Sequence, residues 1–167
     1  MTTTNTQFNG AQTINQFQQG PVQGQLDERT GAGQTLPAQM HATCTGTGVP
    51  GTALTVVDEG GGIPKVIETQ TTTADVFGFI AFDKIHSTFP SGTPVDVACL
   101  SDTVMYMSAG AAISRNAKVM LGGTIAAPTV VTQTSTNTIV GRALDKAFAA
   151  GDLIRVAIDL PGRTAQP

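Results

Sequence analysis

The sequence predicts an all-β fold: a small β-barrel, β-tulip or sandwich of about eight to ten short strands, with an extended N-terminal arm. Thr and Val are frequent, and the 167 residues include 19 glycines and 9 prolines, a composition that favours strands and turns. Short apolar runs recur at fairly regular spacing, with turn signals between them. No stretch of ten residues follows the 3.6-residue period of a helix convincingly, so the strands should dominate.

The C-terminal part of the chain carries the clearest strand pattern. In residues 152–160 every second side chain is a large apolar one, as in a strand with one buried face. Residues 138–144 form a similar run, and the connection 145–152 is short and ends in Gly-Asp. We therefore predict an antiparallel hairpin that closes the domain. The alanine-rich segment 145–150 could make one helical turn.

The chain divides into an N-terminal arm (residues 1–35), a folded domain (36–162) and a C-terminal tail (163–167). Residues 1–26 contain no charged side chain and many glutamines and asparagines, and they bury too little apolar surface to fold alone. Two interpretations stay open: a disordered polar tail, or an arm that becomes ordered on a neighbouring subunit. The anchors of such an arm would be its apolar residues, namely Phe8, Ile14, Phe17, Val22 and Leu26.

Within the folded domain, residues 76–82 form the most apolar and aromatic run. They predict a central strand in which Gly78 marks a bulge or a close approach of the backbone. Residues 95–100 and 104–107 are two further strands that the short polar segment between them predicts to be a hairpin. Other strands are expected at 52–57, 63–70, within 109–121, and at 129–133.

Charge and targeting signals limit the partners to be expected. The net charge is -3 and no basic run occurs, whereas nucleic-acid binding requires clustered lysine or arginine. The N-terminus lacks the apolar core of a signal peptide, and the apolar runs are too short to cross a bilayer. We therefore expect a protein made in a cytosol, with neither nucleic acid nor membrane as a partner.

Four residues raise the question of a metal site: His41, Cys44, His86 and Cys99. Tetrahedral zinc needs four such ligands, but the second pair is separated by twelve residues and forms no zinc knuckle. Cys99 lies in an apolar strand, where a buried thiol is ordinary packing. The two cysteines are too few for a disulfide framework, although they could form one bridge. No metal is expected.

Catalytic motifs are not evident. The sequence has no Gly-x-Ser-x-Gly, and Asp58 and Glu59 lie in a glycine-rich turn where exposed acids normally occur. The segment 59–65 lacks the spacing of a phosphate-binding loop. We expect no enzyme activity, no cofactor and no small-molecule substrate, and we infer a structural or interaction protein. Three aromatic side chains are expected in the core and not on a stacking platform: Phe77, Phe79 and Phe82.

The second half of the chain contains an ordered series of short motifs. They are Gly110…Ile113…Asn116-Ala117-Lys118-Val119, then Gly123, then Ile139-Val140-Gly141-Arg142-Ala143-Leu144, and then Ala149-Ala150-Gly151-Asp152-Leu153-Ile154-Arg155-Val156. This order resembles the family of tailed-bacteriophage capsid decoration (cement) proteins over residues 92–160. Residues 75–79 resemble an earlier strand of that family. Asn116 stands where the family pattern has glycine, which leaves the turn type at that position open.

The resemblance implies a small barrel-like or tulip-like fold and a structural role in the virion. It implies a homotrimer bound to the major capsid protein, on the outside of the icosahedral head at three-fold and quasi-three-fold sites. There the protein would stabilise the head against the pressure of packed DNA, with the N-terminal arm contacting neighbouring subunits. The family has no known catalytic residues. The alternative is another virion β-protein, such as the base of a head fibre or a tail or receptor-binding component.

Overall fold

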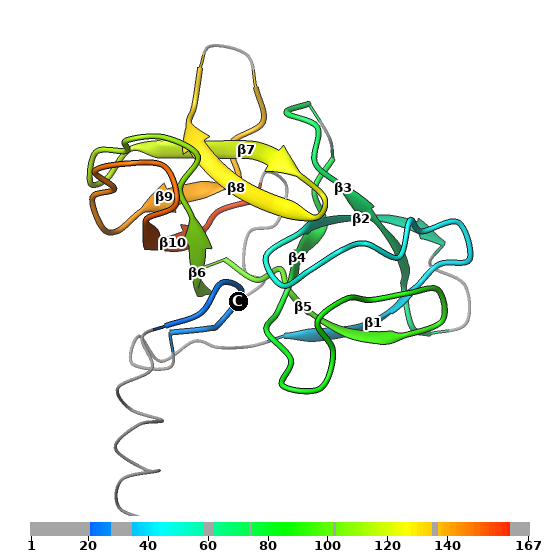
Figure 1. Cartoon of the computed structure of the whole chain (residues 1–167). Helices are drawn as coiled ribbons and strands as arrows, with labels where there is room; N and C mark the ends of the chain where they lie inside the picture. The colour runs from blue at the N-terminus through cyan, green and yellow to red at the C-terminus, as the bar shows by residue number, and fades with distance from the viewer. Residues whose placement is uncertain are drawn as a thin grey trace, which may run out of the picture.

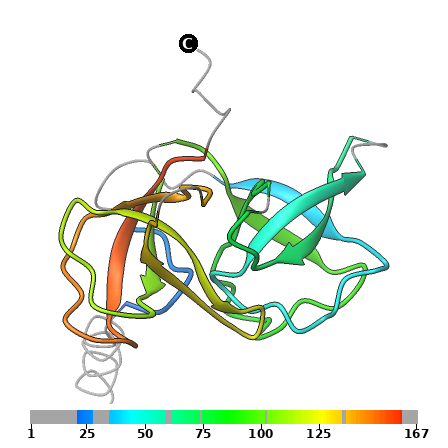
Figure 2. The ribbon, with the colours of Figure 1, turned by 90° about the horizontal axis from the view of Figure 1, so that it is seen from above.

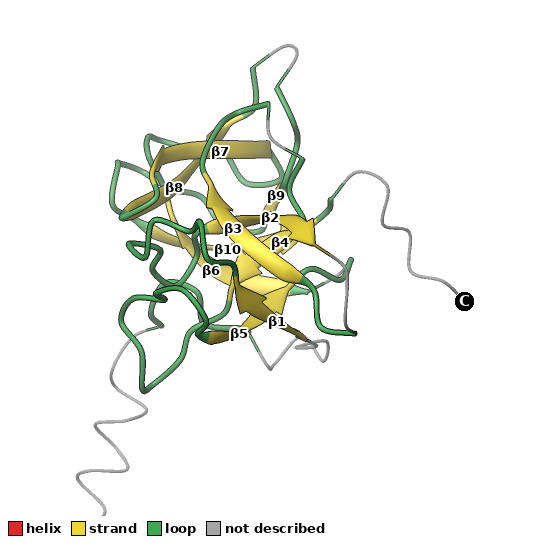
Figure 3. Ribbon diagram, turned by 90° about the vertical axis from the view of Figure 1, so that its right-hand side faces the viewer, coloured by secondary structure: helices red, strands yellow, loops and turns green. Residues whose placement is uncertain are grey.

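The computed structural model describes residues 21–27, 35–58, 62–73, 75–101, 103–134 and 137–160. Within these residues the regular structure consists of ten strands and no helix, which confirms the predicted all-β class (Figure 3). The strands are β1 (Leu36–Met40), β2 (Ala53–Asp58), β3 (Lys65–Thr69), β4 (Gly78–Ile80), β5 (Pro94–Ala98), β6 (Val104–Ser108), β7 (Lys118–Thr124), β8 (Ala127–Thr132), β9 (Gly141–Ala143) and β10 (Leu153–Ile158).

The first five strands form a closed barrel in the order β1-β3-β2-β4-β5 (Figure 1, right). Strand β1 closes it, because it pairs in parallel with β3 on one side and antiparallel with β5 on the other. The parallel pair is long-range: Gln39 lies opposite Lys65 and Met40 opposite Val66. Closure leaves this part of the molecule without a free strand edge.

The last five strands form a second sheet in the order β6-β10-β9-β7-β8, beside the barrel (Figures 1 and 2). The two outer strands of this sheet approach each other. Ala109, directly after β6, bridges in parallel to Val130 of β8, and the Gly110 amide donates a hydrogen bond of 2.8 Å to the Val130 carbonyl. The sheet therefore curls until its ends meet at one point.

One continuous apolar core extends through both halves of the molecule. Every second residue of β10 is buried, which fits the predicted strand with one face in the core. Side chains also join the halves: the Thr52 hydroxyl donates to the Ile125 carbonyl at 2.9 Å, and the Gln70 amide donates to the Gly122 carbonyl at 2.7 Å. The barrel and the β7–β8 hairpin are thereby tied together.

The predicted closing hairpin is confirmed, because β9 and β10 pair antiparallel with Val156 opposite Ala143. Gly78 marks a close approach: an added Cβ would lie 2.5 Å from a methyl group of Val97. The predicted hairpin of 95–100 and 104–107 is wrong, because β5 pairs within the barrel and β6 pairs with β10 of the second sheet. No helical turn forms at 145–150, where Ala147 bridges to Ile113.

Residues 21–27, which we call the arm base, extend the second sheet beyond β6. The Gly24 amide donates to the Tyr106 carbonyl at 2.8 Å, and the Tyr106 amide donates to the Gln25 carbonyl at 2.9 Å. Leu26 forms an antiparallel bridge with Met105. Part of the region predicted as an arm thus pairs with the body of its own chain. Residues 1–20 and the C-terminal 163–167 lie outside the described residues.

Candidate interaction surface

The most exposed large apolar side chain of the described residues lies in the loop after β4. Ile85 is 84% exposed, and Phe82 is 41% exposed. Asp83 shapes the loop: one carboxylate oxygen accepts a hydrogen bond from the Ile85 amide at 2.8 Å, and the other contacts His86 Nδ1 at 2.5 Å. The hydrogen bond with His86, helped by the Ile85 amide, lowers the pKa of Asp83. We call residues 82–87 the ridge, because a hollow lies on either side of it.

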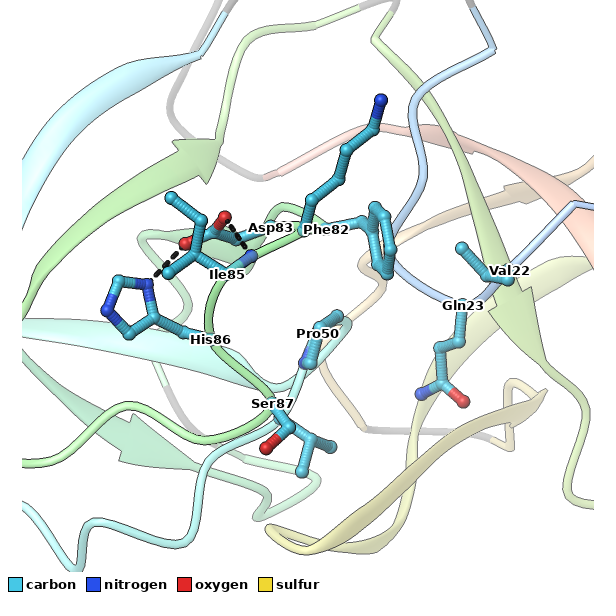
Figure 4. A pocket seen from close by; sticks show the side chains of 10 residues that line it. Val22, Gln23, Pro50, Phe82, Asp83, Ile85, His86 and Ser87 are labelled. Atoms are coloured by element: carbon cyan, nitrogen blue, oxygen red, sulfur yellow. Dashed lines mark hydrogen bonds and ion pairs between the residues drawn. The ribbon is translucent and has the colours of Figure 1, made fainter. Parts of the chain in front are cut away.

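The first hollow, called here the groove, has a volume of about 520 Å³ and lies between the ridge and the arm base (Figure 4). Its apolar lining residues include Val22, Phe82 and Ile85. Polar and charged side chains also line it, namely Gln23, Asp83, Lys84, His86 and Ser87. The second hollow, of about 430 Å³, lies between the ridge and the strands β1 and β5. Partly exposed apolar side chains that gather at a hollow are typical of a surface that binds another chain.

An ion-pair cluster fixes the arm base beside the groove. The Arg155 guanidinium contacts Asp145 through Nε and Nη2, each at 2.8 Å, and reaches Asp27 of the arm base at 3.4 Å. The side chain of Asp27 is only 3% exposed. The hydrogen bond from Arg155 lowers the pKa of Asp145, and the hydrogen bond to Asp145 raises the pKa of Arg155. These contacts hold the arm base on β10, and with it Val22 at the wall of the groove.

A second exposed aromatic side chain lies in the loop between β9 and β10. Phe148 is 76% exposed, and Lys146 Nζ lies 4.4 Å from the centre of its ring. Asp152 orders this loop, because its carboxylate accepts hydrogen bonds from the Phe148 amide at 2.7 Å and the Ala149 amide at 3.0 Å. Phe148 therefore offers another point of apolar contact, on the second sheet.

The structure separates the residues considered for a metal site. Among the described residues no group of three or more histidine, cysteine, aspartate or glutamate side chains could hold a metal ion. His41 Nδ1 contacts the Thr43 hydroxyl at 2.8 Å, and His86 pairs with Asp83. Cys44 and Cys99 do not form a disulfide bond. Burial, and then the negative charge of Glu68, raise the pKa of Cys44.

The aromatic residues predicted for the core divide between two environments. Phe79 is fully buried and Phe77 is partly buried against the core, but Phe82 is exposed and lines the groove. The prediction for Phe82 is wrong because β4 ends at Ile80, so the alternation of a strand does not extend to residue 82. The apolar run 76–82 contains no residue that marks the end of the strand.

Of the five arm residues predicted as anchors, two are described. Val22 is 39% exposed and lines the groove, whereas Leu26 is partly buried against the core of its own chain. Phe8, Ile14 and Phe17 lie outside the described residues. A contact of these anchors with a neighbouring subunit stays a prediction.

Glu68 is a buried carboxylate that no sequence pattern indicated. Glu68 of β3 is 7% exposed and accepts hydrogen bonds from the Thr45 amide at 2.9 Å, the Thr45 hydroxyl at 3.1 Å and the Gly46 amide at 3.0 Å. The Gly48 amide also points to it, at 3.4 Å. Its partners are 20 to 23 residues away along the chain, so no local motif could reveal the contact.

The comparisons with known proteins are sparse. No family model matches the chain, and no curated protein sequence matches it. Among solved structures, the N-terminal base of the head fibre protein gp8.5 of bacteriophage phi29 is similar at 18% identity with a TM-score of 0.44, over 75% of this chain and 93% of the phi29 chain. A similarity of this size does not establish a shared fold.

The described residues include no helix with the length and hydropathy of a membrane span.

Proposed function

We propose that the protein is a non-enzymatic structural component of a tailed-phage virion: a decoration protein that binds the major capsid protein on the outside of the head. It acts as a homotrimer at three-fold and quasi-three-fold sites and stabilises the head against internal pressure. The N-terminal arm extends to neighbouring subunits. The resemblance of residues 92–160 to decoration proteins is the basis of this proposal.

The observation that supports it most is the arrangement of the motif segments. The motifs that carry the resemblance fall on β7, β9 and β10, which are adjacent in one sheet. Two glycines of the pattern have positive φ angles: Gly123, near the end of β7, has a φ of 74°, and Gly151, in the turn before β10, has a φ of 89°. Asn116, where the pattern has glycine, has a φ of 65°, and asparagine is among the few residues that tolerate this left-handed conformation. The substitution therefore keeps the turn that glycine would make.

The exposed side chains suit a protein that makes several modest contacts. The ridge with Ile85 lies beside the barrel, and Phe148 lies on the second sheet, so apolar contact points occur on both halves. A trimer presents each of them three times, and the second and third contacts form as intramolecular events at high effective concentration. A cyclic trimer also closes on itself and does not polymerise. The net charge of -3 fits an outer surface away from DNA.

The test is co-sedimentation of purified protein with undecorated heads of the phage that encodes it. Full-length protein should saturate the heads at about three copies per three-fold site, as a cyclic trimer requires. A variant that lacks residues 1–20 measures the contribution of the arm. The truncation stops at 20 because residues 21–27 pair with β6, so their removal would also expose the edge of the second sheet.

A matched full-length control separates arm contacts from arm length. Replacing Phe8, Ile14 and Phe17 by serine removes the predicted anchors, whereas replacing Gln7, Thr13 and Gln18 by serine changes neighbouring polar positions. We expect the first triple variant, but not the second, to bind heads as weakly as the truncated protein. Absence of head binding by the full-length protein would refute the decoration role and favour a head-fibre base or a tail component.

A further inference from the structure

We propose that the groove receives the N-terminal segment, residues 8–17, of a second copy of the chain. Phe8, Ile14 and Phe17 of one copy would pack against Val22, Phe82 and Ile85 of the other. The inference deepens the proposed function, since it rests on an arm that extends to neighbouring subunits and identifies the surface that this arm occupies.

The chemistry of groove and segment is complementary. Three side chains at the groove are exposed apolar ones, with exposed fractions of 39% for Val22, 41% for Phe82 and 84% for Ile85. The segment carries no charged side chain, so it brings no charge of its own that would have to be buried in the groove. Its glutamine and asparagine amides can form hydrogen bonds with the polar groups of the rim, such as Ser87.

The described chain turns at the groove, directly after the proposed segment. The Gln25 amide donates to the Val22 carbonyl at 3.1 Å, a β-turn that reverses the chain at the groove. The arm base lies between β6 and the ridge, because Leu26 bridges to Met105 of β6 and the Phe82 amide donates a hydrogen bond of 2.8 Å to the Gly24 carbonyl.

The length of chain before the arm base is sufficient for a neighbour. Phe17 is four residues from Pro21 and can lie at most about 14 Å from it, whereas Phe8 is thirteen residues away and can reach about 45 Å. A compact domain of this size has a diameter of about 40 Å. The distal part of the segment can therefore cross to an adjacent copy. In a closed ring each copy donates one segment and receives one, so that every groove is covered.

The experiment is disulfide cross-linking between two different chains that each carry one introduced cysteine, in a Cys44→Ser background in which the buried Cys99 is the remaining native cysteine. One chain carries Asn9→Cys, next to Phe8 in the distal part of the segment, and a mass tag. The other carries Ser87→Cys, at an exposed position on the groove wall. Mixed and mildly oxidised, they should give a covalent heterodimer that mass spectrometry identifies. Ser114→Cys, exposed on the turn before β7 and not part of the groove, replaces Ser87→Cys as the control and should give only background cross-linking.

Apolar contact is tested on the groove side by Ile85→Ser, added to the Ser87→Cys chain. The yield at limiting oxidant should fall by about tenfold or more, because burial of an isoleucine changes an equilibrium constant by roughly 10- to 100-fold. Phe148→Ser is the matched control: Phe148 is 76% exposed but lies outside the groove, so the yield should not change. Both residues are exposed, and neither change should unfold the chain. Equal effects of the two substitutions would overturn the assignment.

The same chemistry distinguishes the other occupants. A chain that carries both cysteines and yields only an intramolecular disulfide, with no heterodimer from the mixed chains, would show that the segment binds its own groove and would overturn the proposal. No cross-link of either kind would also overturn it. If no heterodimer forms but the protein binds heads, the groove assignment is wrong and the decoration role stands. If the heterodimer forms but the protein does not bind heads, the groove assignment stands and the decoration role is wrong.

Discussion

Replacement of Phe79 by alanine should cost about 4–5 kcal/mol of unfolding free energy, the upper part of the usual range for a buried phenylalanine. Phe79 is fully buried on β4, the strand between β2 and β5. Its cross-strand partners are Ala53 and Ala98, which are themselves fully buried and project from the same face of the sheet. Because both neighbours are small, they cannot fill the space left by the ring, and a cavity remains.

The loss would be a large share of a total stability of about 5–15 kcal/mol. With a slope near 2 kcal/mol per molar urea, the unfolding midpoint should fall by about 2 M while the slope stays unchanged. Phe79→Leu, which keeps most of the apolar volume, should cost about 1.5 kcal/mol or less and ensures a measurable transition. The assay is equilibrium unfolding in urea followed by far-ultraviolet circular dichroism.

Phe148→Ala is the matched control for the same chemical change. Its ring is 76% exposed, and its contact with Lys146 is an exposed cation–π pair that contributes about 0.5–1 kcal/mol. Its midpoint should therefore fall by about 0.5 M or less. If Phe79→Ala shifted the midpoint no further than Phe148→Ala, the burial of Phe79 on β4, between β2 and β5, would be refuted.

Two further predictions concern the buried and paired carboxylates. Glu68→Gln should lower the free energy of unfolding by about 1–3 kcal/mol and speed hydrogen exchange in the loop 45–48, because an amide cannot accept all the hydrogen bonds that the carboxylate accepts. The control Asp58→Asn removes an exposed ion pair and should lower it by less than about 1 kcal/mol. Equal losses for the two variants in urea unfolding would contradict the structural role of Glu68. The pKa of Asp145 is lowered by Arg155, so its contribution to stability is present above the pKa of the unfolded chain and is lost as pH falls through the lower pKa of the folded state. Urea midpoints from about pH 5 to pH 2 should therefore fall less steeply for Asp145→Asn than for the native chain, and parallel profiles would refute the link.

The sequence predicted those parts of the fold that depend on neighbouring residues. The alternation in 152–160 and the short connection before it determined the β9–β10 pair, which is local. Pairings between distant segments left no such signal: β1 lies beside β3 in parallel, and β5 and β6 follow each other in sequence but belong to different sheets. A polar pair such as Ser101-Asp102 predicts a turn, but it does not determine whether the next strand returns to the same sheet.

The candidate surface was even less accessible to sequence reasoning, because its parts come from three separate segments. Arg155 occupies a position that alternation predicts to be on the outer face of β10, yet it is bound to Asp27, 128 residues earlier. Exposure of Phe82 depends on the end of β4, which apolar residues on both sides of Ile80 conceal. The absence of charge from the arm was visible in the sequence, but the groove beside the arm base was not.

Three polar clusters hold the walls of the groove, and one of them, Asp83 with His86, also lines it. Glu68 orders the loop 45–48 that leads into Pro50, Arg155 holds the arm base that carries Val22, and Asp83 shapes the ridge that carries Ile85. Each cluster positions one wall, so the apolar side chains are held in place before a partner arrives. A preorganised surface loses less conformational entropy on binding. In the proposed contact the charged side chains of these clusters would therefore act indirectly, by fixing the backbone from which the exposed apolar side chains project.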